Sequence, residues 1–209
     1  MGRYTEFAKK FDNFAMTRFA EYIDAKSQFE TAEKKANSFG NISPTDYEAL
    51  AARSRATAAY NEAKGVFEGA KKKLLNSDIE LAKIRKELES ELAVNFRARP
   101  QDIDNDVLTL LNADIITPDE GKYLLDEANP TMKRVLLKFF SRKADEAERD
   151  KDTATARGFN TLRYQAQADS PSNYLRVFDE LVDIFVRTTQ NTSMIPHWRE
   201  LSEPLLEVF

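Results

Sequence analysis

Apolar residues recur every three or four positions through the first 40 residues, and polar or charged residues fill the positions between them. This spacing places the apolar side chains on one stripe of an α-helix. We therefore expect one long helix over residues 3–38, ended by Gly40 in the left-handed conformation. Aromatic residues and alanine make up the stripe: Tyr4, Phe7, Phe11, Phe14, Tyr22, Ala25, Phe29, Ala32, Ala36 and Phe39.

A second stripe of the same kind runs through residues 47–92. Ser43 is a favoured N-cap residue and Pro44 suits the first helical position, so the second helix is expected to begin there. Within it, Ser77 and Glu80 form a capping-box pattern, which predicts a kink or a restart. Two long helices with matching stripes, joined by a short turn, predict an antiparallel, coiled-coil-like helical hairpin over residues 1–96.

The pattern changes after residue 96, where Arg97–Gln101 is expected to be a linker. Three cap-and-proline pairs, Thr117-Pro118, Asn129-Pro130 and Ser170-Pro171, mark helix starts. Short helices are predicted at about 104–113, 118–128, 130–154, 156–168, 171–189 and 196–207. No β-strand signal of useful length is present, so the fold class is predicted to be all-α, with a hairpin over 1–96 and a bundle of short helices over 97–209.

Composition limits the possible chemistry. The 209 residues include six glycines and no cysteine. The low glycine content disfavours all-β and doubly wound α/β folds. The absence of cysteine excludes disulfides, thiolate catalysis and cysteine-bound metals, and it fits a reducing cytoplasm. The first residues contain no long apolar run, so we expect neither a signal peptide nor a membrane span, and a cytoplasmic protein.

Net charge is −4, distributed as +1 over residues 1–96 and −5 over residues 97–209. Neither part has the clustered basic residues that a general nucleic-acid surface requires, so no nucleic-acid partner is expected. The basic run Lys71–Lys73 and the pair Arg53 and Arg55 are interpreted as solvated helix positions rather than phosphate contacts.

Candidate catalytic and metal-binding residues are few. His197 is the only histidine, and we interpret it as a surface or capping residue beside Trp198. Asp102–Asp106 resembles the start of a calcium loop, but Val107 replaces the required glycine, so a helix N-terminus explains these acids better. No phosphate-binding, dinucleotide-binding or hydrolase motif is present. We therefore expect no catalytic residue, cofactor or metal, with a carboxylate-only enzyme as the remote alternative.

The apolar stripes predict an interaction surface instead. A two-helix hairpin leaves much of such a stripe exposed, and burial gains roughly 25 cal/mol per Å². We therefore expect self-association into a homo-oligomer. The apolar C-terminus is expected either to dock on its own bundle or to insert into a partner. The candidate interaction residues are Phe7, Phe11, Phe14, Phe29, Phe67, Leu74, Leu88, Leu205, Leu206 and Phe209.

Residues 106–140 carry a distinctive series: a leucine-rich start, Thr-Pro-Asp-Glu from Thr117, and Asn-Pro-Thr-Met from Asn129. This series resembles helical, scaffolding-type proteins from the head-assembly modules of tailed bacteriophages of Gram-positive hosts. The resemblance implies a capsid-assembly role and a capsid protein as partner. The chain departs from that group at its C-terminus, which is apolar and acidic where a basic helical segment often binds the shell.

Two hypotheses follow. The first is a non-enzymatic, phage-encoded assembly protein in the host cytoplasm, which self-associates through residues 3–96 and binds a capsid or other phage protein. The second is a phage-encoded inhibitor or adaptor that binds a host protein through the acidic helical surface of residues 97–209.

Overall fold

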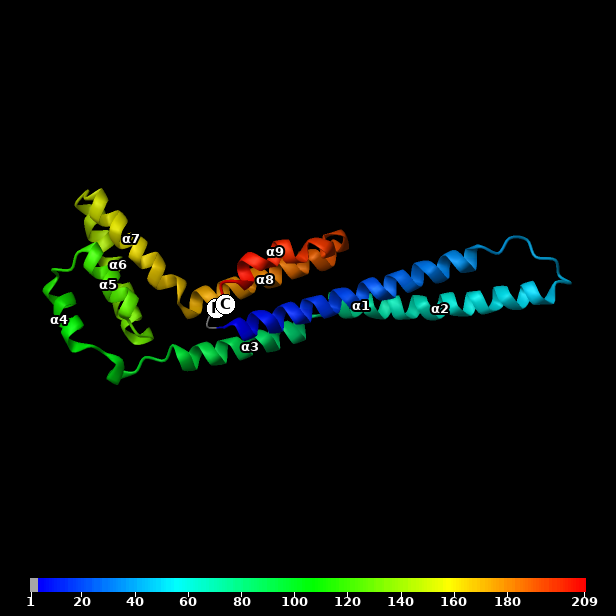
Figure 1. Ribbon diagram of the computed structural model, residues 1–209, viewed down its shortest axis with the longest axis horizontal. Coiled ribbons are helices and arrows are strands. Elements are labelled where there is room, and N and C mark those ends of the chain that lie inside the picture. The colour runs from blue at the N-terminus through cyan, green and yellow to red at the C-terminus, as the bar shows by residue number, and fades with distance from the viewer. Residues whose placement is uncertain (1–3) are drawn as a thin grey trace. The chain divides into compact units, whose positions relative to one another are not determined.

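The computed structural model describes residues 4–209 and confirms the predicted all-α class. These residues are 84% helical and contain no strand (Figure 1). The elements, in chain order, are α1 (Thr5–Asn37), α2 (Tyr47–Leu75), α3 (Asp78–Asn95), η1 (Pro100–Asp102), α4 (Asn105–Ala113), α5 (Pro118–Glu127), α6 (Pro130–Arg149), α7 (Thr153–Ala168), α8 (Pro171–Gln190), η2 (Thr192–His197) and α9 (Trp198–Leu206).

The turn between α1 and α2 differs from the prediction. No glycine among the described residues has a positive φ, so Gly40 does not end α1 in a left-handed conformation. Instead, the Ser38 hydroxyl donates to the carbonyl of Lys35. The N-cap of α2 is Asp46, whose carboxylate accepts from the amide of Ala49 at 2.9 Å. A carboxylate suits the positive end of the helix dipole, and α2 consequently begins three residues later than Pro44.

A break follows α2 at the predicted position. Ser77 is buried, and its hydroxyl donates to the carbonyls of Lys73 and Leu74 at the end of α2. Ser77 is predicted to cap the start of the next helix, but its side chain caps the end of the preceding helix, α2. Glu80 instead accepts from the Arg18 guanidinium of α1 at 3.4 Å.

Most other helix starts agree with the sequence. Thr117 and Glu120 form a full capping box at α5, and Asn129 caps α6. Asp104 caps α4 by accepting from two amides, as expected for aspartates at a helix N-terminus rather than in a calcium loop. The predicted helix over 130–154 is wrong at its end, because α6 stops at Arg149 and Asp152 caps α7.

The described chain forms two compact units, and they differ from the predicted division at residue 96. The first unit runs to Ile84 and also includes Asp179–Phe209. The second unit is Arg85–Phe178. The reason for the difference is that the C-terminal segment packs on α1 instead of joining the preceding short helices.

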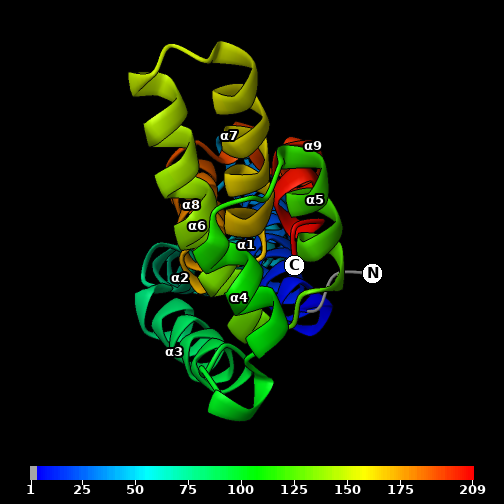
Figure 2. The same cartoon turned by 90° about the vertical axis from the view of Figure 1, so that its left-hand side faces the viewer.

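In the second unit, α7 lies between α6 and α5 (Figure 2). Gly158 of α7 faces Pro118 of α5 so closely that a Cβ on Gly158 would lie 2.7 Å from the proline ring. Gly121 of α5 faces Leu162 and Phe140 in the same way. Ten buried residues form the core of this unit: Leu111, Ile116, Leu125, Leu136, Phe139, Phe140, Ala144, Phe159, Leu162 and Ala166.

Candidate interaction surface

The first part of the α1 stripe is buried within the first unit. Phe11 is 1% exposed, and its ring stacks on Trp198 of α9 with 6.2 Å between centroids. Phe185 of α8 contacts both Phe11 and Phe14, at 6.4 and 5.7 Å. Within the folded chain Phe11 is therefore covered by the C-terminal segment.

Trp198 is a contact residue that the sequence reasoning did not identify. Its indole is 1% exposed and also contacts Phe19 and Phe185, at 5.3 and 6.1 Å. The indole N–H donates to the carboxylate of Asp12 at 2.9 Å, so the buried polar atom has a partner. The adjacent His197 is exposed and lies 3.3 Å from Glu200, which fits the surface role predicted for it.

The C-terminal candidates lie on the same unit. Phe209 is buried, and its carbonyl accepts from the amide of Tyr4. Leu205 and Leu206 are partly buried, as is Phe7 at the start of α1. Of the two predicted outcomes for this end, docking within the chain is observed, but the docking partner is α1 and not the bundle over 97–209.

Beyond this covered region, α1 and α2 continue as a pair that we call the arm, defined as residues 21–68. The two helices run in opposite directions, since Tyr22 pairs with Phe67 and Phe29 with Tyr60, each at 5.6 Å between centroids. Phe29 also stacks on Phe67 at 5.3 Å. These rings contact one another across the pair, yet Phe29, Tyr60 and Phe67 all remain partly exposed.

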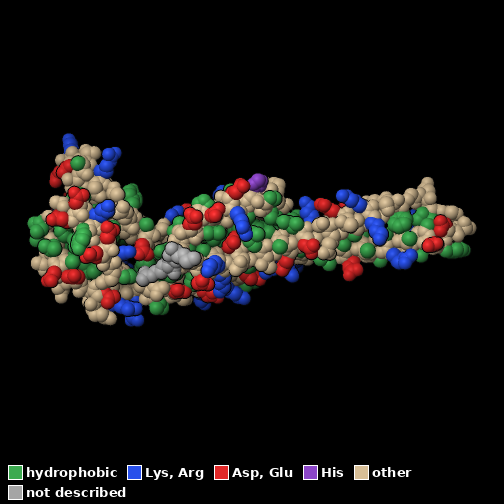
Figure 3. All heavy atoms as spheres, in the orientation of Figure 1, with side chains coloured by type: hydrophobic (Ala, Val, Ile, Leu, Met, Phe, Trp, Pro, Cys, Tyr) green, Lys and Arg blue, Asp and Glu red, His purple; other side chains and the backbone are tan. Residues whose placement is uncertain are grey.

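The arm's surface combines exposed apolar residues with charge (Figure 3). Tyr47 is 79% exposed, Val66 52% and Ile23 49%. An added Cβ on Gly65 or Gly69 would meet no atom within 4 Å, so nothing in the described chain covers this side of α2. Two other candidates lie elsewhere: Leu74 is buried at the end of α2, and Leu88 is buried in the second unit.

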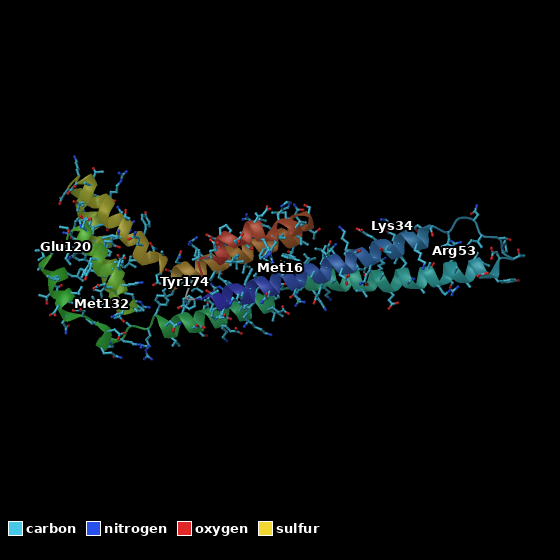
Figure 4. The ribbon with its side chains drawn as sticks, viewed as in Figure 1. Met16, Lys34, Arg53, Glu120, Met132 and Tyr174 are labelled. Atoms are coloured by element: carbon cyan, nitrogen blue, oxygen red, sulfur yellow. The ribbon has the colours of Figure 1, made fainter. Side chains whose placement is uncertain are left out.

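Charge is unevenly distributed along the arm. Its loop end, residues 34–55, carries four basic and two acidic side chains. Its root, residues 21–33 and 56–68, carries six acidic and two basic side chains. Figure 4 places Lys34 on α1 and Arg53 on α2 near the loop. The arm is therefore positive toward the loop and negative toward the root.

Acidic clusters and surface hollows are the remaining features of the described residues that bear on chemistry. No group of three or more His, Asp or Glu side chains among residues 4–209 is arranged to hold a metal ion. A surface hollow lies open beside α7 in the second unit, with Lys151, Arg157 and Tyr164 in its lining. There the Asn160 amide donates to Glu148 at 2.9 Å.

Comparisons with known protein families, with curated proteins and with solved structures found no match for this chain. Across residues 4–209, none of the helices combines the length and the apolar character that crossing a bilayer requires.

Proposed function

We propose that this chain is a non-enzymatic helical assembly protein that self-associates through its arm. The observation that carries this proposal is the partly exposed aromatic seam of Phe29, Tyr60 and Phe67, which no third helix of the first unit covers. Apolar area buried against a partner gains roughly 25 cal/mol per Å². A second helix pair is the simplest partner for this aromatic seam, because two such pairs together form a four-helix bundle with the same packing.

The size of the arm indicates a weak complex. A helix pair about 18 residues long is ~27 Å by ~20 Å, so one flank offers on the order of 500 Å². Stable interfaces bury ~800 Å² per partner, so a dimer held by the arm alone is expected to be concentration-dependent. Such weak, repeated contacts suit a protein that acts during assembly and is then released.

The second unit is the proposed site for the assembly partner. Residues 106–140, which resemble phage head-assembly proteins, form α4, α5 and the first half of α6. Ile115 and Tyr123 of this segment are 66% and 64% exposed. A capsid or other phage protein in the host cytoplasm is the partner that the resemblance suggests, and these two side chains are the proposed contacts.

One observation favours the alternative, a phage-encoded inhibitor or adaptor. Residues 101–127 carry eight acidic side chains and one basic side chain. This segment therefore offers a basic host protein a negative surface, with the exposed Ile115 and Tyr123 beside the charges.

Light scattering across a dilution series tests the proposal. We expect an average mass that rises from the 23.9 kDa chain toward twice that value as concentration increases. A mass that stays at 23.9 kDa up to the solubility limit contradicts self-association. Co-expression separates the two roles, because an assembly protein yields large particles with its capsid protein, whereas an inhibitor holds one host protein at small fixed stoichiometry.

A further inference from the structure

We draw no further inference here: the strongest candidate, the open hollow beside α7 whose lining includes Lys151 and Arg157, carries nothing, because the carboxylates of Glu148 and Asp150 offset these two cations and nothing in the structure shows what binds there.

Discussion

Replacing Phe11 by alanine removes a ring from the centre of the contact between α1 and the C-terminal segment. The ring is 1% exposed and contacts Trp198 and Phe185. Truncating a buried phenylalanine typically costs 3–5 kcal/mol, from lost transfer free energy and from the cavity left behind. We expect Phe11→Ala to lower the free energy of unfolding of the first unit by about 3–4 kcal/mol.

Trp198 provides the assay, because it is the only tryptophan and it belongs to the same cluster. Urea unfolding followed by its fluorescence reports on the first unit alone, in dilute solution where the chain is monomeric. In Phe11→Ala the native emission is expected to shift to longer wavelength as water reaches the indole. The matched control is Phe29→Ala on the same helix, whose partly exposed ring should cost about 1–2 kcal/mol and leave the native emission unchanged.

Equal losses of stability in the two variants, with no change of emission in Phe11→Ala, refute this reasoning. That result means the C-terminal segment does not cover the start of α1 in solution. Phe11 then returns to the set of residues available to a second copy.

Two further predictions concern the second unit. Gly158→Ala forces a Cβ to within 2.7 Å of the Pro118 ring and should destabilise the protein by about 1–3 kcal/mol in thermal unfolding. The control Gly69→Ala meets open space and should stabilise the protein by up to ~1 kcal/mol. Equal shifts in melting temperature for the two variants contradict the close packing of α5 on α7. Thr117→Ala should cost about 1 kcal/mol by removing the cap of α5. Backbone and side-chain hydrogen bonds from Thr117 lower the pKa of Glu120. The ionised Glu120 carboxylate therefore stabilises the fold at pH values above the usual pKa range of a carboxyl group, and this contribution is lost as pH falls through the lowered pKa. Carboxyl chemical shifts followed by NMR should show the Glu120 pKa rising in Thr117→Ala, and an unchanged pKa rules out the capping box.

Local sequence signals predicted the helices well, for a physical reason. A stripe of apolar residues and a capping side chain act within one or two turns of the same helix. Thr117 and Asn129 cap their helices as their sequence patterns indicate. The choice between two nearby caps was harder, because Ser43 and Asp46 both satisfy the pattern and only the second caps α2.

What covers each stripe could not be predicted, because it depends on contacts between distant residues. Asp12 and Trp198 are 186 positions apart, and nothing in the local pattern of either residue identifies the other. The stripe of α1 shows the same spacing where the C-terminal segment covers it and where the arm leaves it open. The lone tryptophan in an apolar C-terminal segment was the available signal that this segment packs on an aromatic-rich helix.

Hydrogen–deuterium exchange as a function of protein concentration tests self-association through the arm most directly. A dimer interface must open before the amides beneath it exchange, so binding slows exchange where copies meet. We predict that raising the concentration slows exchange in residues 21–68 and leaves residues 85–178 unchanged. Exchange that is independent of concentration, or protection that develops only in residues 85–178, contradicts the arm as the surface through which copies associate.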